Sequence, residues 1–200
     1  MNHSPRKTAP EVRSGRVQKK NNWDETPDYY ISEQPELVID RKRPGEGFRH
    51  LLSQSDIHRF ISIVPDWEKH SQGLNAVVLE PGNKRYLGCY VHGVISVCAW
   101  TINDCIEVNT EFCRRSQDML NCLSVPRLPD GNGRWLLQFD EDTARAYSLL
   151  STFLHELGHH NDTMNTRKKE NANRGESHAE EFALELGLKL WPTYQKAFGI

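Results

Sequence analysis

The sequence has no long hydrophobic run and no excess of one charge. No apolar segment reaches the roughly 20 residues that a membrane-spanning helix needs, and no apolar stretch typical of a signal peptide lies near the first residue. Lys and Arg number 25 against 27 Asp and Glu, for a net charge of -2. This balance gives the whole chain no attraction to nucleic acid or to membranes. We therefore expect a soluble, cytoplasmic protein that does not bind a membrane.

Cysteine is scarce and scattered. The five cysteines are odd in number and include no Cys-x-x-Cys pair, so they indicate neither a disulfide framework nor an all-cysteine zinc site. No residue pairing marks any of them as a catalytic nucleophile. We interpret most of them as buried thiols, at Cys89, Cys98, Cys105, Cys113 and Cys122.

Apolar residues are also scarce in residues 1–34. Among the first twenty residues Glu11 is the one acidic side chain, against the cations Arg6, Lys7, Arg13, Arg16, Lys19 and Lys20. Such a segment cannot bury enough apolar surface to offset the entropy lost on ordering. We predict a disordered basic tail over residues 1–34, through which an acidic partner or nucleic acid could bind, and one folded domain over residues 35–200.

Between residues 35 and 139 the pattern predicts a small sheet and short helices. Residues rich in Val, Ile and aromatics predict strands over 37–39, 75–80, 85–100 and 135–139. Helices are expected over 56–64 and 110–123. Ser55 would cap the first helix, and Gly93 would mark a bend within 85–100. We interpret His92 as a structural histidine with an ordinary hydrogen bond.

A longer amphipathic helix follows. Six apolar residues recur at i, i+3, i+4, i+7, i+8 and i+11, the spacing of one buried helical stripe: Ala146, Leu149, Leu150, Phe153, Leu154 and Leu157. Asp140 or Asp142 could cap the start of this helix, and the polar residues 161–163 suggest its end.

This helix contains the run His155-Glu156-Leu157-Gly158-His159-His160. Residues four apart lie on one helical face, so the imidazoles of His155 and His159 can both reach one metal ion. Glu156 then lies beside the first ligand, where its carboxylate can reach a water on that ion. The simpler alternative is a pair of half-exposed histidines, but the helix phase favours a metal site.

A second helix is expected from about residue 176. Its apolar face consists of Ala179, Phe182, Ala183, Leu186 and Leu190. Asn173 with Glu176, or Ser177 with Glu180, could form its capping box. Pro192 is expected to end it and to leave residues 193–200 frayed, and the polar residues 161–175 would form an exposed loop.

The two helices together resemble the zincin metallopeptidases of the gluzincin type, and among these the ImmA/IrrE-like group. The resemblance rests on His155-Glu156-x-x-His159 and on Glu176-x-x-Ala179-Glu180-x-Phe182-Ala183, and covers residues 140–192 at most. In that group the second motif reads Glu-x-x-Ala-Asn-x-Phe-Ala. The resemblance implies an α+β, zincin-like fold, with a small mixed or antiparallel sheet packed on the HExxH helix and a C-terminal glutamate helix.

The resemblance also implies one zinc ion, bound by His155, His159 and Glu176. Two histidines and one glutamate are a common catalytic zinc set. His178 is the competing third ligand, because imidazole also binds zinc well, and Glu181 is a weaker candidate. Glu180 stands where the family more often has Asn or Asp. It would accept the second N–H of a zinc-bound histidine and so orient that ring.

The chemistry expected of such a site is peptide-bond hydrolysis. Three protein ligands leave one position for water, whose pKa zinc lowers to about 7. Glu156 would act as the general base toward that water and pass the proton to the leaving amine. We predict a zinc-dependent endopeptidase acting on a protein or peptide substrate. The alternative is a metal-binding structural or protein-interaction module without peptidase activity, which would not need Glu156.

Two further parts of the site stay open from sequence. A residue that stabilises the oxyanion could be any of Tyr86, Tyr90, His92, Tyr147, His160 and His178. In zincins an edge strand near the zinc pairs with an extended substrate, so the resemblance makes residues 134–139 a candidate peptide-binding edge. The alternative is an ordinary core strand.

Overall fold

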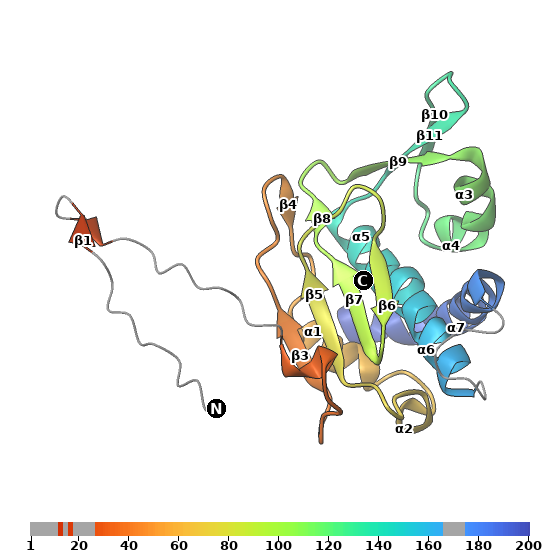
Figure 1. The fold of residues 1–200 in the computed structure, drawn as a ribbon. Helices are drawn as coiled ribbons and strands as arrows, with labels where there is room; N and C mark the ends of the chain where they lie inside the picture. Colours follow the sequence, from red (N-terminus) through yellow and green to blue (C-terminus); the bar gives the residue numbers. More distant parts are fainter. Residues whose placement is uncertain (1–11, 14–15, 18–26, 166–174) are drawn as a thin grey trace, which may run out of the picture.

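The computed structural model describes residues 12–13, 16–17, 27–165 and 175–200 (Figure 1). Most of the expected N-terminal tail therefore lies outside the described residues, apart from the short paired strands β1 (Val12–Arg13) and β2 (Arg16–Val17). Residues 27–34 are described and contain the 3-10 helix η1 (Asp28–Tyr30). Tyr29 is buried there and donates a hydrogen bond to the Asp40 carboxylate at 2.8 Å, so this end of the predicted tail packs on the domain.

A four-stranded mixed sheet forms one layer of the domain. Its strands follow the order β3-β5-β7-β6, with bounds Val38–Arg41, Ala76–Glu80, Val94–Cys98 and Gly88–Val91. β3, β5 and β7 run parallel, and β6 pairs antiparallel to β7 as one edge of the sheet.

The tight turn between β6 and β7 contains both residues that the sequence pattern singled out there. Gly93 has a φ of 79° and His92 a φ of 45°, and His92 is exposed. The prediction of an ordinary sheet histidine was therefore wrong, because the chain reverses direction at His92 and turns its side chain to solvent.

A second, three-stranded antiparallel sheet has the order β10-β11-β9. Its strands span β9 (Cys105–Asn109), β10 (Arg127–Pro129) and β11 (Arg134–Gln138). β9 was not expected from sequence. Because β9 and β10 pair with both sides of β11, the predicted peptide-binding edge at residues 134–139 is wrong: that strand is the centre of its sheet. A two-stranded pair, β4 (Phe48–Arg49) and β8 (Trp100–Thr101), completes the β structure.

The short helices differ from prediction in their caps and breaks. α1 (Gln54–Ile61) is capped by Ser53 in a capping box with Asp56, so the predicted cap, Ser55, lies inside the helix. α2 (Trp67–His70) follows it. In place of one helix over 110–123 there are two, α3 (Thr110–Arg115) and α4 (Gln117–Cys122), which meet at Ser116.

The long helix that carries the histidine motif is continuous from residue 141 to 165. It consists of α5 (Glu141–Tyr147), the π-helical segment η2 (Ser148–Phe153) and α6 (Leu154–Asn165). Asp140 caps it by accepting the Thr143 N–H at 2.8 Å. All six residues of the predicted apolar stripe are buried, which confirms the predicted phase. The helix ends at Asn165, beyond the predicted residues 161–163.

α7 (Gly175–Phe198) runs through Pro192 rather than ending there. Proline removes one backbone donor and crowds the preceding turn. Tyr194 stacks on Trp191 and Phe198, with ring centroids 6.0 and 4.3 Å apart, and this packing holds the last two turns in place. The predictions of a stop at Pro192 and of a frayed end were therefore wrong.

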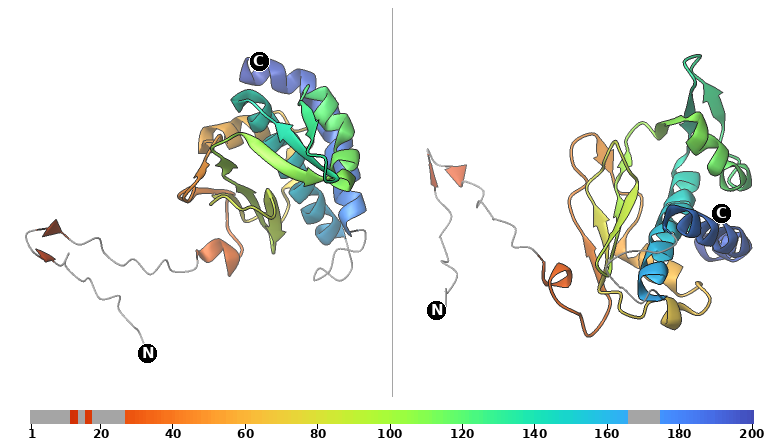
Figure 2. Two further views of the ribbon diagram at one scale, coloured as in Figure 1. Left: turned by 90° about the horizontal axis from the view of Figure 1, so that it is seen from above. Right: turned by 45° about the vertical axis from the view of Figure 1, so that its right-hand side comes forward.

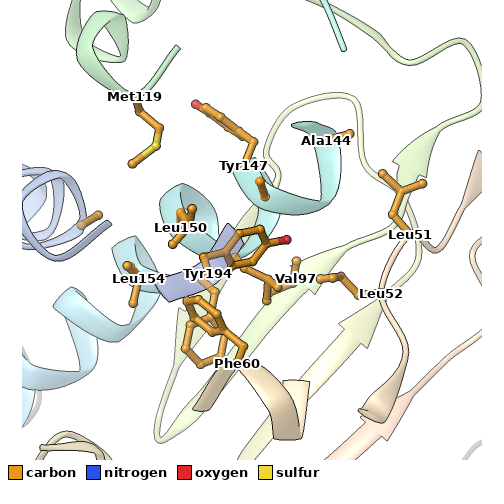
Figure 3. Close-up of a cluster of buried hydrophobic side chains, with 14 of the residues drawn as sticks. Leu51, Leu52, Phe60, Val97, Met119, Ala144, Tyr147, Leu150, Leu154 and Tyr194 are labelled. Carbon is orange, nitrogen blue, oxygen red and sulfur yellow. The ribbon is translucent and has the colours of Figure 1, made fainter. Parts of the chain in front are cut away.

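The core lies between the mixed sheet and the two long helices. In Figure 2 the sheet, the α5–η2–α6 helix and α7 follow one another as layers. Figure 3 shows side chains from each of them converging, including Val97 of β7, Leu150 of η2 and Tyr194 of α7. The fold is thus a mixture of α and β elements. None of the described helices is long and apolar enough to cross a membrane.

Candidate metal centre

Two histidines of α6 face each other across one helical turn. The Nε2 atoms of His155 and His159 lie 3.1 Å apart, and the ring planes are nearly perpendicular at 85°. Both side chains are largely buried, with 24% and 17% of their surface exposed. Burial, and next the neighbouring His159 ring, lower the pKa of His155. The neutral imidazole that results is the form that binds a metal.

Glu176, in the first turn of α7, joins the two histidines. Its Oε2 lies 3.2 Å from His155 Nε2, and its Oε1 lies 3.5 Å from His159 Nε2. Ligands about 2.0–2.2 Å from a tetrahedral zinc ion lie about 3.3 Å from each other, so the three residues fit zinc. Among the described residues no other group of three His, Cys, Asp or Glu side chains converges in this way. The Glu176 side chain is 71% exposed, which leaves the group open to solvent.

A close crossing of α6 and α7 brings Glu176 to the histidines. A Cβ atom added at Gly158 would lie 2.8 Å from the Ala179 Cα and 3.2 Å from its carbonyl oxygen. A larger residue at Gly158 would therefore push the helices apart. Sequence reasoning missed this role, although a glycine inside a helix costs stability and commonly has a packing reason.

The Glu156 carboxylate is buried but has no hydrogen-bond partner among the described residues. The residue is 6% exposed and borders the cleft described below. Burial, and next the charge of Glu176, raise the pKa of Glu156 to about 8. A carboxylate without a protein partner is available to exchange a proton with a molecule in the cleft.

Glu156 also lies against the edge strand β6. A Cβ atom added at Gly88 would lie 3.1 Å from Glu156 Oε1 and 2.6 Å from Thr152 Cγ2. Only glycine allows the strand to approach the helix this closely. The free edge of β6 therefore starts beside the candidate general base.

An open cleft of about 2060 Å³ runs past these groups. His155, Glu156 and His159 border it from α6, and β6, β9 and α3 contribute its walls. Pockets for small molecules usually measure about 300–1,000 Å³. The cleft is therefore large enough for a segment of polypeptide.

The competing ligand candidates point elsewhere. His178 packs near the Phe182 ring, with centroids 6.4 Å apart, and belongs neither to the converging group nor to the described cleft lining. Glu181 is exposed and also lies outside the group. Glu180 pairs with Arg115 of α3. The expectation that Glu180 orients a ligand histidine is therefore wrong here, because an arginine from a distant segment takes its carboxylate.

The candidate oxyanion donors separate by their access to the cleft. Tyr86, Tyr90 and His92 border it. Tyr147 also borders it but is buried, and its hydroxyl lies 3.4 Å from Ser116 Oγ. Among the described lining residues His160 and His178 are absent, so a substrate in the cleft does not reach them.

His160 instead joins α6 to the β-sheet side of the site. Its Nε2–H donates to the Gln72 carbonyl oxygen at 3.0 Å, and its Nδ1 accepts from the Tyr90 hydroxyl at 3.2 Å. The Tyr90 oxygen accepts the Gly93 N–H at 3.1 Å. Burial lowers the pKa of His160 to about 4, in keeping with a neutral ring that donates once and accepts once. This chain of bonds fixes the β6–β7 turn against the helix.

The cysteines contribute no disulfide, and all five are free thiols. Cys98 and Cys113 are buried, and the other three are partly buried. Burial raises the pKa of Cys98 to about 12, so its thiol is protonated at neutral pH.

Comparisons of the chain with models of protein families, with curated proteins and with solved structures found no match. The resemblance to gluzincins thus rests on two short motifs, and the geometry of the site is the ground for any assignment of function.

Proposed function

We propose that this protein is a zinc-dependent endopeptidase with a zincin-like fold of the gluzincin type, related to the ImmA/IrrE-like group. One observation carries the proposal. Three donor atoms converge at zinc-ligand separations next to a buried carboxylate without a partner, in a cleft that admits a polypeptide. Five free thiols suit our further proposal of a cytoplasmic location.

In the proposed mechanism His155, His159 and Glu176 hold the metal. When bound, zinc would supply a Lewis acid that polarises the scissile carbonyl and lowers the pKa of water. Glu156 accepts a proton from the attacking water and delivers it to the leaving nitrogen as the C–N bond breaks. Its burial favours both steps, because the raised pKa lets the same carboxyl group act as base and then as acid.

The substrate is proposed to bind along β6 rather than along β11. β6 is a sheet edge, and its first residue, Gly88, lies beside Glu156. An extended peptide that adds to this edge gains main-chain hydrogen bonds with little demand on its sequence. Its backbone would then pass the general base.

A binding or structural module that holds the metal without hydrolysis is the second candidate. A purely structural zinc site is normally closed by four protein ligands. Here the described residues supply three, and the third is largely exposed. The open group and the unpartnered Glu156 favour the peptidase.

Replacing Glu156 with Gln separates the two candidates. The zinc-loaded wild type should cleave an unfolded protein such as β-casein, and Glu156→Gln should cleave it roughly 10²–10⁴-fold more slowly, because the amide cannot accept the proton. Bound zinc, measured by atomic emission, should stay at one ion per chain in both proteins. Equal cleavage by the two zinc-loaded proteins would remove Glu156 from the mechanism, and a wild type that holds zinc without cleaving would favour the binding module.

A further inference from the structure

Two exposed cations border the cleft without an ion-pair partner among the described residues: Lys84 and Arg85. The other basic residues of the lining are already paired, Arg134 with Glu107 at 3.0 Å and Arg115 with Glu180. The charge available to a ligand at this rim is therefore positive, although the whole chain carries a net charge of -2.

The loop that carries these cations is tied in place. The Asn83 side-chain oxygen accepts the Arg85 N–H at 2.8 Å, and the Gly82 N–H donates to the Pro44 carbonyl oxygen at 2.8 Å. The second bond joins the loop to a neighbouring one that carries the exposed Arg43 and Glu46. Three cations and one carboxylate thus share this end of the cleft, which keeps its net charge positive.

The distance from these cations to the candidate general base is set by the backbone. Gly88 touches Glu156, and Arg85 and Lys84 precede Gly88 by three and four residues. At about 3.3 Å per extended residue the two cations lie at most about 10–13 Å along the strand from Gly88. A peptide that pairs with β6 covers the same distance in three or four residues.

We propose that Lys84 and Arg85 bind an acidic side chain of the polypeptide substrate, three or four residues from the scissile bond. This inference rests on the proposed function. A peptide is favoured over nucleic acid because the cations stand at the end of a sheet edge that offers main-chain hydrogen bonds. Nucleic-acid surfaces, in contrast, carry basic residues along a whole face.

Binding of defined peptides tests the proposal without requiring turnover. The probes are fluorescent peptides of alternating Val and Glu, Val and Gln, or Val and Lys, added to full-length, zinc-loaded Glu156→Gln and followed by anisotropy. The Val-Glu peptide should bind about three- to tenfold more tightly than Val-Gln, the range that exposed ion pairs provide. In the same background Lys84→Glu with Arg85→Glu should remove this preference and favour Val-Lys.

A matched control changes the net charge equally at a distance from the cleft. Lys69 and Lys189 are exposed and lie outside the described lining, so Lys69→Glu with Lys189→Glu should keep the preference for Val-Glu. The proposal is overturned if neither peptide binds, if Val-Glu and Val-Gln bind equally, or if the preference survives reversal of Lys84 and Arg85. It is also overturned if an oligonucleotide of equal charge binds more tightly than Val-Glu and loses binding on that reversal.

These outcomes separate the inference from the proposed function. Cleavage of β-casein by the wild type without any acidic preference would leave the peptidase proposal standing and remove the role of Lys84 and Arg85. An acidic preference in a protein that never cleaves would do the opposite.

Discussion

Glu176 is the most exposed of the three converging residues, and it is also the one that sequence could assign only by resemblance. Its two carboxylate oxygens face the two histidines separately, at 3.2 and 3.5 Å. His178, two residues later, lies on a different face of α7, where it packs near Phe182. A two-residue step on a helix turns the side chain by more than half a circle, so the two residues cannot serve the same ion.

Alanine substitutions at these two positions have opposite expected outcomes. Glu176→Ala should weaken zinc binding by more than about 100-fold, beyond the loss typical of residues that only support a ligand. His178→Ala should bind zinc as the wild type does. Competition against a metal-sensitive chelating dye measures both affinities. Unchanged affinity in Glu176→Ala, or a matching loss in His178→Ala, would contradict the assignment.

At the scale of elements, the contact between α6 and α7 decides whether the ligands meet. Gly158→Ala would add helix propensity worth up to about 1 kcal/mol, but it would also drive a methyl group into the Ala179 backbone. We expect the collision to win, with a lower free energy of unfolding in urea for the zinc-free protein and zinc binding at least about tenfold weaker. A more stable variant with unchanged zinc affinity would show that the helices do not need this close contact.

Strand pairing, also at this scale, explains why the predicted substrate edge was misplaced. Residues 134–138 do form a strand, as the alternation indicated. Whether a strand is an edge depends on its neighbours, and β9, whose pairing with β11 spans a long stretch of sequence, closes one side of it. The prediction of the strand was right and the prediction of its role was wrong, because only the first depends on local pattern.

At the scale of the whole molecule, zinc should stabilise the fold, because its proposed ligands come from two helices. A ligand at 100 times its dissociation constant adds about 2.7 kcal/mol to the free energy of unfolding. For a domain of this size that corresponds to a rise in Tm of roughly 5–10 °C. Differential scanning calorimetry with zinc, and again after a chelator, measures the shift. Glu176→Ala should show little of it, whereas an equal rise in that variant would place zinc elsewhere.

The sequence by itself determined the buried stripe of the long helix, the mixture of helices and strands, and the pairing of His155 with His159 on one face. All of these follow from periodicity within a single segment, which the local backbone geometry enforces. The tertiary structure alone decided the rest: the partner of Glu180, the edge position of β6, the close approach at Gly158, and the unpaired cations Lys84 and Arg85 at the cleft rim. Each of these depends on which segments, distant in sequence, pack together, and periodicity within one segment carries no information about its neighbours.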